Sequence, residues 1–216
     1  IVVGNLAESG ADKIGANSLL ARVSSYYHDI GKGENPHYFI ENQPAHSKNI
    51  HDDMDPYESA NIIFKHLSDG KEKAEKYNLG RDIIGILMQH HGTGVVKIFH
   101  QKAITQAQDS VHDLEINELD FQYPGPKPQT LEAALVMIAD ISEASTRSLD
   151  DPTSESIDQM VNKVGWRLLE SGQLDESGIT LLQFRMILDQ YCSVLKAIHH
   201  HRIKYPEQLI NEPSNK

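Results

Sequence analysis

The sequence has few of the residues that mark several large classes of protein. It contains one cysteine, Cys192, in 216 residues, which excludes a disulfide framework and a zinc cluster built from thiolates. Twenty Lys and Arg stand against 31 Asp and Glu, for a net charge of −11, so we expect no grip on DNA or RNA backbones. No apolar run approaches the roughly 20 residues of a membrane-spanning helix. Cys192 is expected to be a small apolar residue on a helix, and an anionic ligand would have to be met by metal ions or a few basic residues.

The length and the apolar pattern predict one all-α domain over residues 1–216. Hydrophobic residues make up 39% and charged residues 24% of the chain, which is ordinary for a globular domain. Apolar residues recur at helical spacing, and strand-like alternation is hard to find. We expect helices from the start to about Ser9, through Leu19, Leu20, Val23 and Tyr27 up to Gly31 and Gly33, from Pro56 through PYESANIIFKHL, and over residues 81–90, 95–108, 130–148, 154–170 and 180–201.

Two irregular segments interrupt these helices. The string GENPHYFIENQPAHSKNIHDDMDP follows the second helix, and DSVHDLEINELDFQYPGPKP precedes the helix that begins near residue 130. Long loops inside compact domains are usually functional or disordered, and we interpret the second string as a loop or lid fixed by its flanking helices. The chain opens at Ile1 within a helical apolar pattern without a cap, which predicts a piece of a longer protein.

Three His-Asp pairs occur in the sequence, and they differ in their surroundings. His28-Asp29 ends a helix in the string YYHDIGKG. A histidine can bind one metal ion while the two carboxylate oxygens of the aspartate bridge two ions. His51-Asp52 is an intermediate case. The pair at residues 112 and 113, His112-Asp113, lies in an acidic segment with no apolar helix before it, and we leave it out.

Other polar residues strengthen the case for His28-Asp29. His66 lies in IIFKHL, His90-His91 in ILMQHHGTG and Asp140 in ALVMIAD, so each follows apolar neighbours and is expected at the inner end of a helix. Singly, each would more often be a buried side chain with a local hydrogen bond. One shared metal centre satisfies all of them together.

The expected ligands are imidazole nitrogen and carboxylate oxygen without sulfur. This set suits Fe or Mn, tolerates Zn or Ni, and is too rich in imidazole for a Mg site. Two ions roughly 3.5–4 Å apart can clamp a nucleophile and a phosphate for in-line displacement. Hydrolysis of a phosphate ester is therefore the expected chemistry.

Three charged residues are candidates for roles around this centre. Lys32, one turn past Asp29, could neutralise a phosphate oxygen, although a solvated lysine near a helix end is its usual role. Glu143 and Arg147 share a helix face with Asp140. Glu143 could orient a metal ligand and Arg147 could meet a phosphate, and a simple ion pair between them on the helix surface is an equal alternative.

These motifs resemble a known family. HDIGK, His66, HHGT and the late Asp140 resemble the HD superfamily of metal-dependent phosphohydrolases. The strings HDIGKG, HYFIENQ, NIHDDMDPYESANIIFKHLSDG, IIGILMQHHGTG and IADISEASTRSL are similar, in that order, to the HD domain of the PgpH family, membrane-bound bacterial receptors that degrade cyclic di-AMP. The likeness covers a core from Ile1 to about Leu149, whereas the C-terminal helices, about 150–205, match less distinctively.

The resemblance implies an HD-domain helical bundle that hydrolyses 3′,5′-cyclic di-AMP to linear 5′-pApA on two divalent ions, iron or manganese. A further family histidine lies in a His-Ser pair just before the string matching IVVGNLAE, where this chain begins. The loop with Asn42 and His51 would close over the substrate, with loop capping by both side chains as an equal alternative. The family's metal ligands, with Asp29 as the bridge, carry over onto His28, Asp29, His66, His90, His91 and Asp140.

The resemblance also implies membrane attachment through a preceding N-terminal region, with this domain on the cytoplasmic face of the bacterial cell membrane. A homodimer is the one assembly that we consider. One alternative is an HD phosphohydrolase for cyclic di-GMP or mononucleotides, but the cyclic di-GMP branch usually carries a Gly-Tyr-Pro string, and here Gly92-Thr93-Gly94 follows the histidines. The other is a cyclic-dinucleotide sensor without catalysis, which predicts lost ligands, whereas all six are present.

Overall fold

The computed structural model describes residues 1–44, 48–108 and 115–200, and the expected all-α fold is confirmed there. His112-Asp113 lies outside these residues. No β-strand occurs in the described part, and none of its helices has both the length and the apolar character needed to cross a bilayer. The α-helices are α1 (Val2–Ile14), α2 (Ser18–Tyr27), α3 (Pro56–Lys76), α4 (Arg81–Gln89), α5 (Lys97–Gln108), α6 (Leu131–Arg147), α7 (Ser154–Glu170) and α8 (Leu181–His200).

The prediction that the first helix ends near Ser9 is wrong. Helix α1 continues to Ile14 and ends at Gly15, whose φ of 75° lies in the left-handed region that favours glycine. Gly10 lies inside the helix because it permits close packing. A Cβ atom there would lie 2.8 Å from side-chain atoms of both Leu135 and Tyr191. A glycine in this sequence therefore marks helix contact at one position and helix termination at the other.

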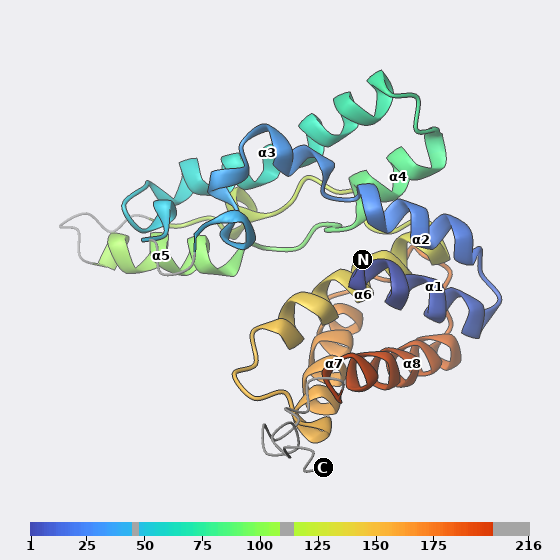
Figure 1. Ribbon diagram of the computed structural model, residues 1–216. Helices are drawn as coiled ribbons and strands as arrows, with labels where there is room; N and C mark the ends of the chain where they lie inside the picture. Colours follow the sequence, from blue (N-terminus) through green and yellow to red (C-terminus); the bar gives the residue numbers. More distant parts are fainter. Residues whose placement is uncertain (45–47, 109–114, 201–216) are drawn as a thin grey trace, which may run out of the picture.

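The main core surrounds the first half of α6, which is apolar on all sides. Its residues from Ala133 to Ala139 are fully buried, as expected for a helix covered by neighbours all round. Helices α1, α2, α4, α7 and α8 pack against it (Figure 1). The buried Tyr191 of α8 donates its hydroxyl to Leu135 O at 2.9 Å, and Cys192 is a buried residue of this core, as expected.

A second, smaller core lies between α3 and α5, on the far side of the molecule from α7 and α8 (Figure 1). Its buried members are Ala60, Phe99, Ala103 and Phe121. Phe121 comes from the 3-10 turn η5 (Glu118–Phe121), inside the string interpreted as a loop or lid. The described end of that string is therefore packed into the fold.

The irregular stretch after α2 consists of short 3-10 turns that are fixed at both ends. They are η1 (Ile30–Glu34), η2 (Pro36–Tyr38), η3 (Ile40–Asn42) and η4 (Ile50–Asp52). At the first end, Gly31 crosses α3 so closely that a Cβ would lie 1.9 Å from His66 O. At the other end, Lys102 Nζ donates to the carbonyls of residues 51, 52 and 54 at 2.7–2.8 Å. The tight crossing at Gly31 brings Asp29 next to His66.

Candidate metal centre

Four helices deliver the predicted ligands to one place. His28 and His90 are the C-cap residues of α2 and α4, as expected for the inner ends of helices. The expectation of helix ends is wrong for His66 and Asp140. They lie inside α3 and α6, because α3 continues to Lys76 and α6 to Arg147. Both still face the centre, since each lies on the side of its helix that the other helices cover.

Three histidine rings are oriented by the same local hydrogen bond. The Nδ1 atoms of His28, His66 and His90 lie 2.6–2.7 Å from the carbonyl oxygen three residues earlier. A carbonyl oxygen only accepts, so each Nδ1 carries the hydrogen. In the neutral ring, Nε2 then presents its lone pair, which is the arrangement of a metal-binding histidine.

The two carboxylate oxygens of Asp29 face two different groups of side chains. Oδ1 lies 3.6 Å from Nε2 of both His66 and His90. Oδ2 lies 3.2 Å from His28 Nε2, which is 3.4 Å from Asp140 Oδ1. The ligand atoms form two groups, and within each group they all lie within 4.8 Å of one another. The imidazole group consists of Asp29, His66, His90 and His91, and the carboxylate group consists of His28, Asp29 and Asp140. Asp29 is the shared member and has the geometry of a bridge.

The centre contains buried polar atoms without hydrogen bonds. Within the described residues, Nε2 of His28, His66 and His90 and Oδ1 of Asp29 have no hydrogen-bond partner. Orphaned buried polar atoms are rare because each costs about 1–3 kcal/mol. When the histidines are neutral, their Nε2 lone pairs and the Asp29 oxygen face one another, and a cation between them satisfies them all, so the donor set fits divalent metal ions.

The two groups differ in their affinity for protons. Burial opposes the charged form of His28, but the facing carboxylates of Asp140 and Asp29 outweigh it and raise its pKa to about 10. Burial, together with the neighbouring His90, lowers the pKa of His66 to about 4. Burial also lowers the pKa of His91 well below its ordinary value. The pKa values of Asp29 and Asp140 are lowered despite burial, through their contacts with histidines.

His91 is held differently from the other three histidines, by an aromatic residue that the sequence reasoning missed. Its ring stacks on Tyr123, with centroids 4.3 Å apart and an interplanar angle of 21°. Tyr123 N donates to Gly94 O at 2.8 Å. Burial, followed by the negative charges of Asp29 and Asp140, raises the pKa of Tyr123 above its ordinary value, so its ring is neutral. The only sequence signal was an aromatic residue before proline in FQYPG.

Lys32 lies beside the centre, where the sequence placed it. Its Nζ is 2.8 Å from Asp29 Oδ2 and 2.6 Å from Glu41 Oε1. Glu41, in η3, was not predicted. Burial opposes the charge on Lys32, yet the two carboxylates raise its pKa. The lysine therefore remains cationic at the open side of Asp29.

The other predicted residues make their contacts outside the cluster. Asn42 is exposed. His51 is buried, and its Nε2 is 2.9 Å from Tyr38 O while its ring packs on Phe99. These contacts are those of the loop-capping alternative. Arg147 pairs with Glu143 at 3.6 Å, which is the surface ion pair that we considered.

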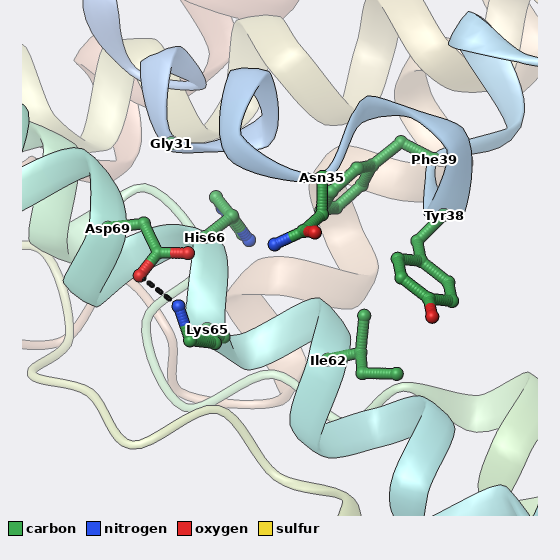
Figure 2. A pocket seen from close by; sticks show the side chains of 8 residues that line it. All are labelled: Gly31, Asn35, Tyr38, Phe39, Ile62, Lys65, His66 and Asp69. Carbon is green, nitrogen blue, oxygen red and sulfur yellow. Dashed lines mark hydrogen bonds and ion pairs between the residues drawn. The ribbon is translucent and has the colours of Figure 1, made fainter.

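A cavity of about 120 Å³ adjoins the centre on the other side of His66. Figure 2 shows it between α3 and the turns η1 and η2, with Asn35, Tyr38 and Ile62 around it and the paired Lys65 and Asp69 along one wall. Of the six predicted ligands, only His66 lines it. The cavity shares one wall with the metal centre and contains no second ligand group.

Known proteins resemble this chain over most of its length. A family model described as the HD domain matches residues 1–145. The chain belongs to the HD-domain family. This HD domain is 42% identical over 207 residues to the cyclic-di-AMP phosphodiesterase PgpH of Bacillus subtilis, an alignment that covers 96% of the chain and 28% of that relative. The chain thus spans little more than a quarter of the relative's length.

Solved structures extend the likeness to the C-terminal helices. The HD domain matches the crystal structure of the L. monocytogenes phosphodiesterase PgpH HD domain with a TM-score of 0.84 and 42% identity, over 92% of this chain and 90% of that one. The same domain in complex with cyclic-di-AMP matches with a TM-score of 0.85, over 94% and 91% of the two chains at 42% identity. The shared fold therefore includes residues beyond the family model's limit at 145, and the resemblance to PgpH is confirmed.

Proposed function

We propose that this HD domain is a phosphodiesterase that hydrolyses cyclic di-AMP to linear 5′-pApA with two divalent metal ions, Fe or Mn. The observation that carries the proposal is the set of four orphaned buried atoms: three histidine Nε2 atoms and one oxygen of Asp29. A cyclic-di-AMP complex of a 42% identical HD domain supports the choice of substrate. The absence of sulfur ligands and the number of imidazoles favour Fe or Mn.

In the proposed reaction, one water molecule is consumed at one phosphodiester. Its oxygen forms a bond to phosphorus, the bond from phosphorus to the 3′-oxygen breaks, and the products are a 5′-phosphate and a free 3′-hydroxyl. When bound, the two ions would neutralise phosphate charge and align the water with the leaving oxygen. His66, His90 and His91 would hold one ion, His28 and Asp140 the other, and Asp29 both.

We propose that Lys32 is the side chain that contacts the phosphate of the substrate. Its Nζ already lies at ion-pair distance from Asp29, so a phosphate oxygen beside this carboxylate is within its reach. We also propose that the exposed Arg147 and Asn42 contact the substrate from the rim, that Glu143 steadies Arg147, and that His51 acts on the substrate through the loop that it fixes.

We further propose that the domain acts at the cytoplasmic face of a bacterial membrane, attached through a preceding segment, and that it forms a homodimer. The basis for the attachment is the similarity of this chain to part of a longer PgpH protein. Light scattering on the purified chain would test the dimer.

Product analysis tests the proposed function directly. The purified chain, loaded with Mn²⁺, is incubated with cyclic di-AMP or cyclic di-GMP, and the products are separated by chromatography. We expect 5′-pApA from the first substrate and much slower turnover of the second. Tight binding of cyclic di-AMP by a metal-loaded chain that forms no product would instead favour the sensor.

A further inference from the structure

The turn that follows His90 and His91 is held by a residue from outside the matched HD segment. Gln173 lies between α7 and α8 and is only 7% exposed. Thr93 N donates to Gln173 Oε1 at 2.9 Å, and Gln173 Nε2 donates to Thr93 Oγ1 at 3.0 Å. The two residues are 80 positions apart in the sequence, so these bonds tie the C-terminal helices to the metal centre.

Gly92 explains how the glutamine reaches this turn. Its φ of 54° lies in the left-handed region. A Cβ atom on Gly92 would lie 2.4 Å from Gln173 Oε1 and 2.9 Å from the terminal methyl carbon of Met137. The glycine thus allows both the turn and the close approach of the glutamine.

A second glutamine completes the hydrogen bonding of Thr93. Gln122 Nε2 donates to Thr93 O at 2.8 Å. The backbone N–H, the carbonyl and the hydroxyl of Thr93 are therefore all paired, with two glutamines from different parts of the chain. A turn residue with every polar group bonded in this way has few alternative conformations.

His91 depends on this turn more than the other histidines do. His28, His66 and His90 each have an Nδ1 bond to a carbonyl of their own helix. No hydrogen bond of the His91 ring is found within the described residues, and its recorded contacts are ring contacts with His66, His90 and Tyr123. The direction of its ring is therefore set by the backbone turn that follows His91, together with the stacked ring of Tyr123.

We propose that Gln173 is a positioning residue of the metal centre. It holds the HHGT turn, so that His91, and with it His90, keeps its direction toward Asp29. Only the kinetic test of this inference, with cyclic di-AMP, depends on the proposed function. Removal of a group that hydrogen-bonds a metal-binding histidine directly typically costs about 10–100-fold in metal affinity or activity. Gln173 acts one step further out, through Thr93, so we expect a loss toward the lower end of this range.

Three variants of the 216-residue chain test the proposal. Gln173→Met keeps the length and apolar packing of the side chain but removes both hydrogen bonds. Gln173→Glu keeps an acceptor for the N–H and the hydroxyl of Thr93. Gln183→Ala is the matched control. Gln183 also accepts from the backbone N–H and hydroxyl of a threonine, Thr180, but at the start of α8, away from the ligands.

Mn²⁺ binding to chelator-treated protein is measured by calorimetry, and folding by circular dichroism. We expect Gln173→Met to bind Mn²⁺ about 10-fold more weakly, Gln173→Glu to stay close to the parent chain, and Gln183→Ala to be unchanged. Parent-like Mn²⁺ affinity of folded Gln173→Met would overturn the proposal. So would an equal loss in Gln183→Ala, which would reveal general destabilisation.

Kinetics with cyclic di-AMP separate this inference from the proposed function. In Gln173→Met at saturating Mn²⁺, we expect kcat to fall while KM changes little, because the substrate contacts are untouched. A parent chain that binds Mn²⁺ but leaves cyclic di-AMP intact would refute the proposed function and leave the metal-binding result standing. A rise in KM alone would contradict a role in holding ligands.

Discussion

The two halves of the candidate metal centre share Asp29 but are built differently. The imidazole group gathers three histidines from α3 and from the end of α4, and burial keeps His66 and His91 neutral. The carboxylate group has one histidine between two aspartates, which raise the pKa of His28 to about 10. In the metal-free protein at neutral pH, His66 and His91 in the first group present free lone pairs, and the second group stores a proton on His28.

This difference shows how one carboxylate can serve two unlike sites. Each oxygen of Asp29 faces one group, at 3.6 Å from the histidines of the first and 3.2 Å from the histidine of the second. A metal ion entering the imidazole group displaces no proton from His66 or His91, whereas one entering the carboxylate group must displace the proton of His28. The two sites should therefore respond differently to pH and to substitution.

The largest expected effect comes from the residue that joins the two halves. Asp29→Asn removes the negative bridge, and we expect loss of cyclic di-AMP hydrolysis by about 1000-fold or more, because bound metal ions supply several kcal/mol of transition-state stabilisation. Helical circular dichroism should be unchanged. Product formation and bound metal are measured on the same sample.

Asp52→Asn is the matched control, because it makes the same chemical change in the other described His-Asp pair. Asp52 is exposed and belongs to neither ligand group, so we expect parent-like turnover. Retained activity in Asp29→Asn would contradict its bridging role and the comparison built on it.

The sequence predicted those ligands whose apolar neighbours already required a helix. His66, His90 and Asp140 each follow a strongly apolar string, and His28 follows the two tyrosines that end its helix. The helical period directs such residues inward wherever the helix ends. This is why all of them converge, although His66 and Asp140 lie inside their helices and not at the helix ends. The all-α fold followed from the same periodicity.

The residues that the sequence did not predict act across the chain. Gln173 and Tyr123 reach the HHGT turn from distant segments, and Glu41 of η3 pairs with Lys32 of η1 across the intervening turn. A local pattern contains no signal for such contacts, because packing sets them. For the same reason His51, whose motif suggested substrate contact, is found with its ring against Tyr38 and Phe99.

The imidazole group and the carboxylate group should release different numbers of protons when a metal ion binds. With His28 protonated at pH 7, filling the carboxylate group should release close to one proton from this residue. His66 and His91 should release none. Calorimetric Mn²⁺ titrations in buffers of different ionisation enthalpy report the number. Asp140→Asn removes one of the carboxylates that raise the pKa of His28, so it should release fewer protons; equal release from both proteins would contradict this account.

The stability of the metal-free chain should depend on pH in opposite ways for the two halves. The raised pKa of His28 gives stability that is present below about pH 6.5 and is lost as the pH rises toward 10. The lowered pKa of His66 has the opposite effect. As the pH falls from 6.5 toward 4, the unfolded chain binds a proton at this histidine that the folded chain does not, so stability is lost. Thermal melting in chelator should therefore be highest near pH 6–7. In Asp140→Asn, the loss on the alkaline side should shrink while the loss on the acid side remains.

The smallest expected effect concerns the approach of the substrate from the side of the carboxylate group. The side chain of Arg147 is 60% exposed, and its only ion pair in the described structure is with Glu143, on the helix of Asp140. If Arg147 contacts the substrate, Arg147→Ala should raise KM for cyclic di-AMP about 2- to 5-fold with kcat unchanged, because an exposed charge contact contributes up to about 1 kcal/mol. The effect should fade at high salt.

Arg167→Ala, an equal change of charge on α7, is the control. Equal KM values for the two variants would leave Arg147 as a surface ion pair, and the substrate would then be held through Lys32 and the metal ions alone.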